Sequence, residues 1–233
     1  MFFHSSSTKV KIYLEAFIIL TKFEPMTIAH DLVQLFPHLA NPQQLFLFEQ
    51  LEQFIKDKQE QSCFILKGYA GTGKTTAIST LIKLLPKYKI KSVLLAPTGR
   101  AAKVLSQYSD KGASTIHRKI YRKKSAFSPE MHFSLAANMH QDTIFIIDEA
   151  SMIADEKTDY SGSSLLEDVI SFVYNQKNNR IIFVGDTAQL PPVGSTESPA
   201  LVSQNVEKFG LKVNQIELTE VVRQEKKSGI LFN

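Results

Sequence analysis

Five short apolar runs recur along the 233-residue chain, separated by turns and by stretches with helical periodicity. Short apolar strands that alternate with helices form a parallel sheet whose two faces are both covered. Since 43% of the residues are hydrophobic, the chain can bury a hydrophobic core on both faces of such a sheet. We therefore predict an α/β fold of three layers with a mainly parallel central sheet. The runs lie at residues 64–66, 92–96, 144–147, 181–184 and, more weakly, 213–218.

A helix is predicted ahead of the first run, over about residues 28–54. Apolar side chains recur there at spacings of three and four, and Asn41 and Pro42 supply an N-cap and a first helical residue. Two segments, 123–142 and 191–199, are predicted to be irregular. No internal repeat or low-complexity tract is evident, so a single domain is expected.

The N-terminal residues do not match this pattern. Residues 12–20, IYLEAFIIL, are apolar but interrupted by Glu15, and they are shorter than the roughly 20 residues that span a bilayer. A weak signal peptide is the alternative, although no small-residue cleavage pattern follows closely. We interpret Met26 as the effective start. Residues 1–25 are then an extension, residues 26–233 form the domain, and no membrane contact is expected.

The single cysteine, Cys63, permits no internal disulfide. Because it opens an apolar run, a buried core position is favoured over a reactive thiol. This cysteine usage fits a cytoplasmic protein. The formal net charge of +4 is compatible with a nucleic-acid partner but does not require one.

A glycine-rich turn follows the first apolar run. Gly68, Gly73, Lys74 and Thr75 match the pattern G-x-x-x-x-G-K-[ST] between a predicted strand and a predicted helix over 74–85. Glycines let backbone amides wrap a phosphate chain, the lysine reaches its outer phosphates, and the threonine hydroxyl can bind Mg²⁺. The alternative is a strand-to-helix turn that needs glycine without binding a ligand, but such a turn would not require Lys74 and Thr75 at these positions. The turn therefore predicts a nucleoside triphosphate site.

Two carboxylates end the third run, IFIIDEASM. Asp148 and Glu149 follow four apolar residues, and parallel sheets bind their ligands at this end of the strand. We predict that Asp148 holds Mg²⁺ through its water shell and that Glu149 is the general base for the attacking water. A solvated acidic turn is the alternative.

The fourth run repeats this geometry. RIIFVGDTAQLPPVGS places Gly185 and Asp186 after a strand, followed by Gln189 and two prolines. A glutamine there could contact the γ phosphate and report its hydrolysis. A proline-rich loop without such a role is the alternative.

Six segments in order, GYAGTGKTT, LLAPTGRAAKVL, STIHRKIY, IFIIDEASMI, RIIFVGDTAQLPPVG and ELTEVVRQ, resemble the first motor domain of RecD-like superfamily 1 (1B) DNA helicases. The resemblance covers about residues 41–224. It implies a RecA-like P-loop NTPase fold and an ATP-dependent DNA helicase that moves from 5′ to 3′ on single-stranded DNA in recombination or repair. A P-loop kinase for a small metabolite would leave APTGRAAKVL and STIHRKIY unexplained.

For the nucleotide, the resemblance implies that Gln44 binds the adenine edge, with Gln43 as the alternative register. It implies that Asp148 and Thr75 bind the metal, and that Lys74, Glu149 and Gln189 act on the γ phosphate. Arg223, in LTEVVRQ, resembles an arginine that stabilises the transition-state charge. The loop residues expected to contact ATP and Mg²⁺ are Gly68, Ala70, Gly71, Thr72, Gly73, Lys74, Thr75 and Thr76.

For DNA, the resemblance implies two contact segments on single-stranded phosphates. A basic cluster follows them, with Tyr121 interpreted as a stacking platform; a solvated basic helix end is the alternative. The expected DNA contacts are Pro97, Thr98, Gly99, Arg100, Thr115 and His117, and the cluster comprises Arg118, Lys119, Arg122, Lys123 and Lys124.

Relatives of this type have two RecA-like domains, and motifs of the second have no counterpart in this sequence. A second motor domain or a RecB-like subunit is therefore an expected partner. Segment 123–142 lies where related enzymes insert a small strand-separating hairpin. The alternative function is a nucleotide-dependent single-stranded DNA-binding module with little turnover, because half of the motor is missing.

Overall fold

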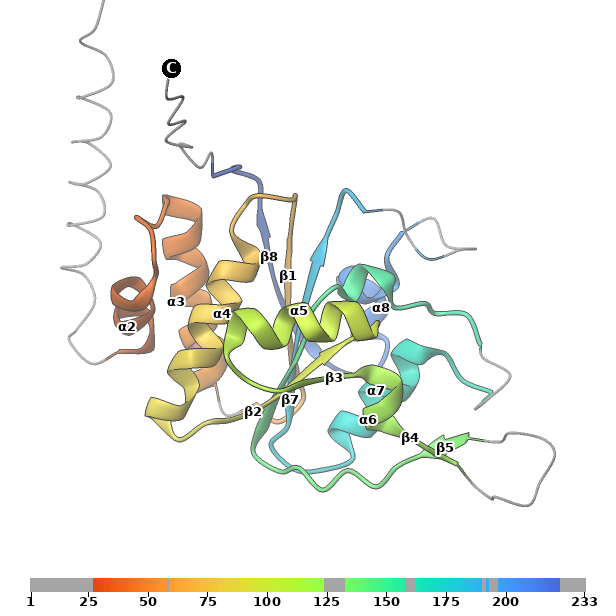
Figure 1. Cartoon of the computed structure of the whole chain (residues 1–233). Coiled ribbons are helices and arrows are strands. Elements are labelled where there is room, and N and C mark those ends of the chain that lie inside the picture. Colours follow the sequence, from red (N-terminus) through yellow and green to blue (C-terminus); the bar gives the residue numbers. More distant parts are fainter. Residues whose placement is uncertain are drawn as a thin grey trace, which may run out of the picture.

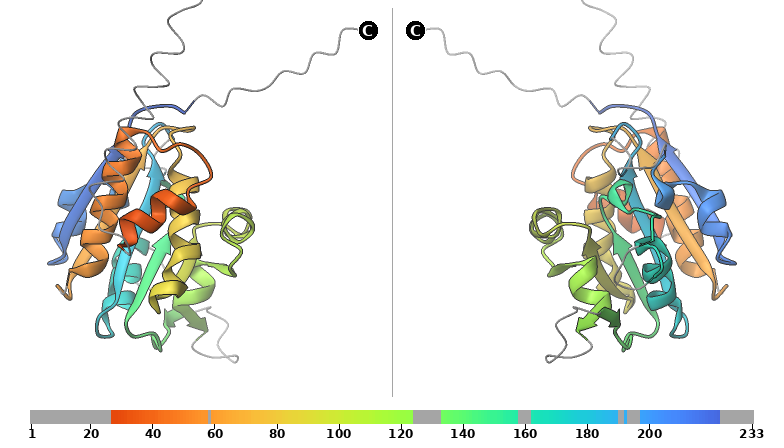
Figure 2. Two further views of the ribbon diagram at one scale, coloured as in Figure 1. Left: turned by 90° about the vertical axis from the view of Figure 1, so that its left-hand side faces the viewer. Right: turned by 90° about the vertical axis from the view of Figure 1, so that its right-hand side faces the viewer.

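A six-stranded parallel sheet lies between two layers of helices in the computed structural model, which describes residues 27–57, 59–123, 133–157, 162–189, 192 and 197–222 (Figures 1 and 2). The strand order is β3-β2-β6-β7-β1-β8. The predicted three-layer α/β architecture is therefore confirmed. The predicted extension 1–25, Met26 as a start and Arg223 lie outside the described residues.

All five predicted apolar runs are strands. The sixth strand, β3, was missed because it is short and its sequence, AST, is not apolar; it pairs with the end of β2, where Ala96 lies opposite Thr115. The strands are β1 (Ser62–Gly68), β2 (Lys91–Ala96), β3 (Ala113–Thr115), β6 (Thr143–Ile147), β7 (Arg180–Asp186) and β8 (Lys212–Leu218).

Two hydrophobic cores lie on opposite faces of the sheet, since successive side chains of a strand point to opposite sides. In β1, Phe64 and Leu66 pack in one core, while Cys63 and Ile65 pack in the other. Cys63 is fully buried, and burial raises the pKa of its thiol, so its core role is confirmed.

The helices divide between these two faces (Figure 2). Short 3₁₀ helices lie in three connections between a strand and a helix, namely η1 (Leu85–Tyr88), η2 (Ala150–Met152) and η3 (Pro199–Leu201). The first core is covered by α2 (Ile28–Leu35), α3 (Pro42–Lys56), α4 (Lys74–Leu84) and α5 (Gly99–Ser109), and the second by α6 (Ile116–Ile120), α7 (Leu165–Tyr174) and α8 (Ser203–Glu207).

The helix predicted over 28–54 is two helices. Phe36 ends α2 in an extended conformation because the following Pro37 disfavours helical geometry at the residue before it. The predicted cap of α3 is confirmed: Asn41 Oδ1 accepts the Gln44 N–H at 2.8 Å, and Gln44 Oε1 accepts the Asn41 N–H at 3.1 Å. This reciprocal capping box fixes the start of α3.

A small hairpin projects from the second layer. Its strands, β4 (Tyr121–Lys123) and β5 (Phe133–Leu135), pair antiparallel, with Tyr121 opposite Leu135. The prediction of irregular structure over 123–142 was wrong for β5, because strands of three residues carry almost no periodic signal. Residues 124–132 lie outside the described part of the chain.

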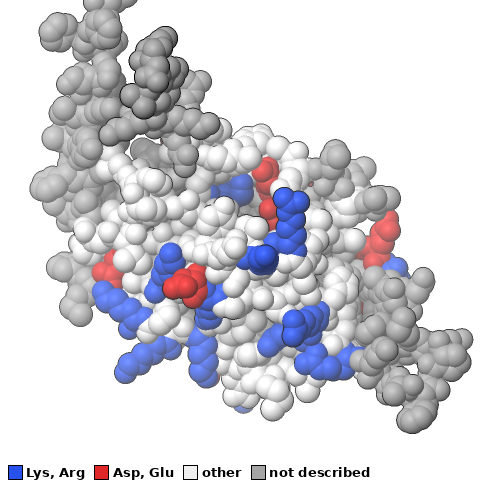
Figure 3. All heavy atoms as spheres, in the orientation of Figure 1, with Lys and Arg blue, Asp and Glu red and all other residues white. Residues whose placement is uncertain are grey.

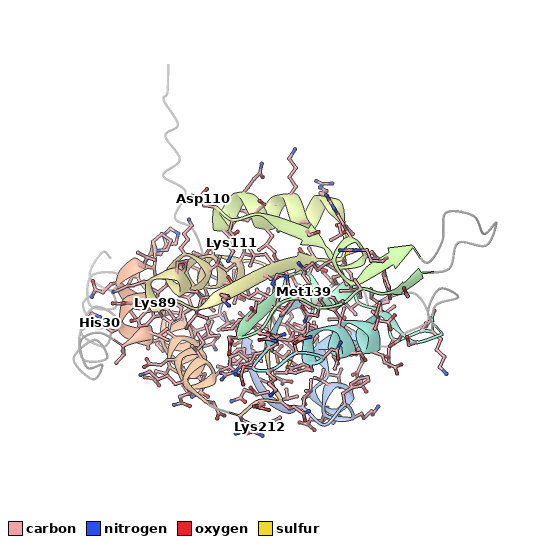
Figure 4. All side chains as sticks on the ribbon, turned by 90° about the horizontal axis from the view of Figure 1, so that it is seen from below. His30, Lys89, Asp110, Lys111, Met139 and Lys212 are labelled. Atoms are coloured by element: carbon pink, nitrogen blue, oxygen red, sulfur yellow. The ribbon has the colours of Figure 1, made fainter. Side chains whose placement is uncertain are left out.

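Helix α5 ends at Ser109, and its C-cap Asp110 adopts a left-handed conformation with φ of 53° and turns the chain toward β3; Asp110 and Lys111 are labelled in Figure 4. Asp tolerates this backbone region better than most residues. Within the described residues, no helix combines the length and the apolar character needed to cross a bilayer.

Candidate nucleotide site and adjoining polar face

A pocket of ≈ 340 Å³ opens at the carboxyl ends of β1, β6 and β7. It brings together most of the side chains predicted for the nucleotide, the metal and catalysis. Three predicted residues are positioned beside it: Thr72 and Gln44 are buried, and Gly68 ends β1. The lining residues are Ala70, Gly71, Gly73, Lys74, Thr75, Thr76, Asp148, Glu149, Gly185, Asp186 and Gln189.

Lys74 is the first residue of α4, and its ammonium group lies inside the curve of the glycine-rich loop. Nζ donates to the carbonyl oxygens of Gly68 at 2.6 Å and Tyr69 at 2.9 Å. Burial lowers the pKa of Lys74, and the nearby carboxylates of Asp186, Asp148 and Glu149 oppose that shift. The ammonium group is thus held where the oxygens of a bound phosphate would compete with the loop carbonyls for its hydrogen bonds.

The loop needs glycine at Gly73 for two reasons. Its φ is +91°, and a Cβ there would come within 2.5 Å of Gln44 Nε2. That Nε2 donates to the Thr72 carbonyl at 3.1 Å, while Gln44 Oε1 caps α3. Both polar atoms of Gln44 therefore have partners within the protein, and its contact with adenine stays a prediction.

Replacing Gly68 by a residue with a Cβ is expected to lower the stability of the fold. Its φ is +153°, and a Cβ would overlap the backbone carbonyl oxygen of Leu218 in the paired strand β8. We expect Gly68→Ala to cost about 2–3 kcal/mol, which lowers the melting temperature by roughly 5–10 °C. Thermal unfolding checks this result. The matched control is Gly112→Ala, since nothing lies within 4 Å of a Cβ there and its φ is not positive; equal losses in both variants would contradict the argument.

The acidic pair lies where β6 ends. The Asp148 N–H donates to the Leu95 carbonyl of β2 at 3.0 Å, which fixes the strand end. Glu149 adopts a left-handed conformation with φ of 55°, and its N–H donates to Asp148 Oδ1 at 3.0 Å. A left-handed non-glycine residue costs about 1 kcal/mol and persists only where the surroundings hold it, as at functional sites.

Asp148 is the most perturbed carboxyl of the pocket. Burial, with a smaller contribution from Glu149, raises its pKa to about 6, while the Glu149 N–H and Lys74 oppose the shift. Its oxygens share the pocket with the Thr75 hydroxyl. Mg²⁺ prefers one or two protein oxygens and completes its shell with phosphates and water. The Asp148 carboxylate and the Thr75 hydroxyl fit that donor set. The described residues hold no cluster of three metal-ligating side chains.

Ionisation of the half-buried Asp148 carboxyl should weaken the nucleotide-free fold as the pH rises from 3.8 to about 6. The folded pKa, about 6, exceeds the ordinary 3.8, so the folded state binds more protons between these values and the free energy of unfolding falls as pH rises through them. We expect Asp148→Asn to recover up to about 3 kcal/mol at pH 8 and almost none at pH 4. Melting curves in metal-free buffer check this. A gain independent of pH would contradict it.

A hydrogen-bonded chain connects the segment after β6 with the segment after β7. The buried Ser151 hydroxyl donates to Gln189 Oε1 at 2.7 Å, and Gln189 Nε2 donates to Glu149 Oε2 at 2.9 Å. Gly185 permits this approach, because a Cβ there would lie 2.6 Å from Leu201 and 3.1 Å from the Ser151 nitrogen. The predicted base and the predicted γ-phosphate sensor therefore contact each other directly.

Sequence reasoning did not assign a role to two polar residues of this region. Ser151, which is buried behind the pocket and holds Gln189, was overlooked because a serine after DEA carries no signal of its own. Asp186 follows an apolar strand just as Asp148 does, and that position could have marked it; its Oδ1 accepts the Ala188 N–H at 2.8 Å and shapes the turn toward Gln189.

A second polar region lies at the carboxyl ends of β2 and β3. Thr98 caps α5 by accepting the Ala101 N–H at 3.1 Å, and Thr115 caps α6 by accepting the Arg118 N–H at 3.3 Å. Each cap uses only an oxygen lone pair, so each hydroxyl can still donate its hydrogen to another group. Thr98 follows β2 and Thr115 ends β3, and these two strands pair in parallel.

A groove of ≈ 400 Å³ runs between α5 and the start of α6. Of the predicted DNA contacts, Gly99 and Thr115 line it, Arg100 and His117 are exposed, and Pro97 is half-buried. This face displays many basic and few acidic side chains (Figure 3). The other lining residues, among them two cations, are Ala102, Lys103, Ser106, Gln107, Ala113, Ser114 and Arg118.

The interpretation of Tyr121 as a stacking platform was wrong. Its ring is buried in the second core, and its hydroxyl donates to Asp168 Oδ2 of α7 at 2.5 Å. The ring of His117 lies 5.6 Å away, centroid to centroid. Tyr121 therefore anchors the base of the hairpin, and Lys124 of the basic cluster lies outside the described residues.

A glycine-rich turn from β1 into α4, with carboxylates at the end of a neighbouring parallel strand, defines a P-loop NTPase fold. The family described as AAA domain matches residues 41–230, and the chain belongs to that family. A solved structure, the Pif1 helicase from Candida albicans, shares the fold at a TM-score of 0.50 and 20% identity, over 79% of this chain and 40% of that one.

Curated relatives agree. The ATP-dependent RecD2 DNA helicase of Deinococcus radiodurans is 30% identical over 167 residues, which cover 72% of this chain and 20% of the relative. The RecD subunit of the RecBCD enzyme of Buchnera aphidicola is 35% identical over 149 residues (56% and 23%), and the DNA helicase dda of phage T4 is 32% identical over 170 (71% and 36%). The resemblance to RecD-like helicases is confirmed, and the chain spans 20–36% of the length of these three proteins.

Proposed function

We propose that this chain is the first motor domain of an ATP-dependent DNA helicase, which hydrolyses ATP and couples the reaction to movement along single-stranded DNA in recombination or repair. One observation carries the proposal. The phosphate loop, the acidic pair and Gln189 open into a single pocket at the carboxyl ends of adjacent parallel strands. That is the arrangement phosphoryl transfer requires, because its catalysis depends on positioning and on charge stabilisation.

In the proposed reaction Lys74 leaves the loop carbonyls and neutralises charge on the outer phosphates. Glu149 accepts a proton from the attacking water, and Gln189, which contacts Glu149, lies where it can orient that water and the γ phosphate. Mg²⁺, held by Thr75 and Asp148, would offset the negative charge of the phosphates. Arg223 is proposed to add a second positive charge from beyond the described residues.

On the second polar region, the cap hydroxyls of Thr98 and Thr115 are proposed to donate to DNA phosphates. Arg100 and His117 are exposed nearby, and Lys103 and Arg118 add positive charge along the groove. Such contacts make binding steeply dependent on salt. The hairpin of β4 and β5 continues from α6, so a strand-separating role is proposed for it.

A second RecA-like domain or a RecB-like subunit is the proposed partner, because two domains must open and close around ATP for movement. The alternative is a nucleotide-dependent single-stranded DNA-binding module with little turnover. A cytoplasmic location remains part of the proposal.

Steady-state ATP hydrolysis with Mg²⁺, measured with and without a single-stranded oligonucleotide, tests the proposal. Strong stimulation by DNA supports the motor. Binding of both ligands without stimulated turnover supports the binding module. Failure to bind either ligand would contradict both.

The hydrogen-bonded chain through Gln189 predicts a non-additive pair of substitutions. Ser151→Ala removes the donor that holds Gln189, so we expect hydrolysis to fall about tenfold with little change in nucleotide affinity. If Ser151 acts through Gln189, the same substitution has little further effect in a Gln189→Ala background. A double-mutant cycle measures this coupling, and additive losses would show that Ser151 acts independently.

A further inference from the structure

The four residues that follow β8, residues 219–222, lie against the phosphate loop, and we name them the exit segment (Figure 1). The Val222 N–H donates to the Gly71 carbonyl at 2.9 Å. The Val221 side chain packs on the same residue, where a Cβ on Gly71 would lie 3.3 Å from Val221 Cγ1. The exit segment is therefore in contact with the loop that is proposed to hold the nucleotide.

Gln43, in the first turn of α3, holds the other end of this segment. Its Oε1 accepts the N–H groups of Thr219 at 2.9 Å and Glu220 at 3.2 Å, and its Nε2 donates to Thr219 Oγ1 at 2.8 Å. Three hydrogen bonds from one side chain thus fix the first two residues beyond the sheet. The capping box places Gln43 there, because it fixes the first turn of α3.

We propose that Gln43 is a positioning residue that brackets the exit segment on the phosphate loop, so that nucleotide binding and the docking of the exit segment are coupled. We call the contact of Gln43 with Thr219 and Glu220 the bracket, and its hydrogen bonds alone support it. The coupling rests on the proposed function, since it requires a nucleotide on the loop.

The coupling follows from the two partners available to Lys74. Without nucleotide, its ammonium group donates to the carbonyls of Gly68 and Tyr69; a triphosphate would compete for it. Loop amides that face phosphates fix the peptide planes of the loop, including the Gly71 carbonyl that accepts from Val222. An ordered loop then favours the docked segment, and by linkage the docked segment strengthens nucleotide binding by the same factor.

This role differs from the alternative register in which Gln43 reads the adenine edge. Adenine would require the same amide oxygen and nitrogen that now bind Thr219 and Glu220. Base recognition would make Gln43 matter for adenine nucleotides alone. The bracket makes it matter equally for any base, because the coupling passes through the phosphate loop.

The bracket is tested by amide hydrogen exchange, followed by NMR on the nucleotide-free chain. In Gln43→Ala we expect the Thr219 and Glu220 amides to exchange about tenfold faster, while Phe183 in the central strand β7 keeps its rate. Gln43→Glu keeps the acceptor oxygen and should preserve most of the protection. The matched control is Gln50→Ala, on the same helix, where the side chain donates to Gln53. Unchanged rates at Thr219 and Glu220 in Gln43→Ala would overturn the proposal.

The coupling is tested by titration calorimetry with the magnesium complexes of AMP-PNP and GMP-PNP. Gln43→Ala should weaken both by the same factor, about threefold, and AMP-PNP should slow exchange of the Val222 amide in the unmodified chain. A loss confined to AMP-PNP assigns Gln43 to the base and overturns the proposal. If the unmodified chain binds neither analogue, the proposed function fails, and the exchange rates still decide the bracket.

Discussion

Replacing Glu149 by glutamine is expected to reduce ATP hydrolysis about a thousandfold while nucleotide remains bound. The amide has nearly the same shape, and its oxygen can still accept from Gln189 Nε2, but it cannot take a proton from water. The measurement pairs a phosphate-release assay with binding of a fluorescent ATP analogue. Loss of turnover without loss of binding identifies Glu149 as the base.

The control for this substitution is Glu167→Gln, which changes the same chemical group on an exposed position of α7. It should leave turnover unchanged. If Glu149→Gln retained more than a tenth of the activity, the proton would have to go elsewhere. Asp148 and Asp186 are the other carboxylates of the pocket.

Replacing Lys74 by alanine should weaken the affinity for nucleotide at least about a hundredfold. The substitution removes the ammonium group that lies at the loop carbonyls, where the phosphates are proposed to bind. The substitution removes a charge that burial disfavours, as the lowered pKa of Lys74 indicates, but it also removes two hydrogen bonds to loop carbonyls, so these opposing effects should leave the stability of the unliganded fold nearly unchanged. Stability and binding therefore change independently, which separates a site effect from misfolding.

Thermal unfolding with and without nucleotide measures both quantities at once. At a hundredfold excess over the dissociation constant, ligand adds about 2.7 kcal/mol, or roughly 5–10 °C, and this shift should vanish in Lys74→Ala. Lys83→Ala, exposed on the last turn of the same helix, should keep the shift. A full shift in Lys74→Ala would exclude the loop as the phosphate site.

Features with a local cause were predictable from the sequence. The apolar runs became strands because alternate side chains must be buried on both faces of the sheet, and Asn41-Pro42 began α3 because a cap and a proline need only their neighbours. The turn from β1 into α4 was equally local. Its glycines permit backbone conformations that other residues resist.

The convergence of the candidate site was predictable in outline, because the carboxyl ends of parallel strands share one edge of a sheet. Lys74, Asp148 and Gln189 accordingly line one pocket. Their partners were not predictable. The contact of Ser151 with Gln189 spans 38 positions in sequence and depends on Gly185 admitting a close approach.

The sequence by itself determined the five apolar strands, the phosphate turn and the end of the sheet at which polar residues would gather, since each follows from the period and chemistry of nearby residues. Only the tertiary structure decided which polar side chains are free to bind a ligand. Tyr121 is buried against Asp168, Gln44 is held beneath the loop, and Gln43 brackets the exit segment 176 positions away. The physical reason is that a polar group forms hydrogen bonds with the groups that tertiary packing places within about 3 Å of it. Those neighbours are determined by long-range contacts rather than by the local sequence.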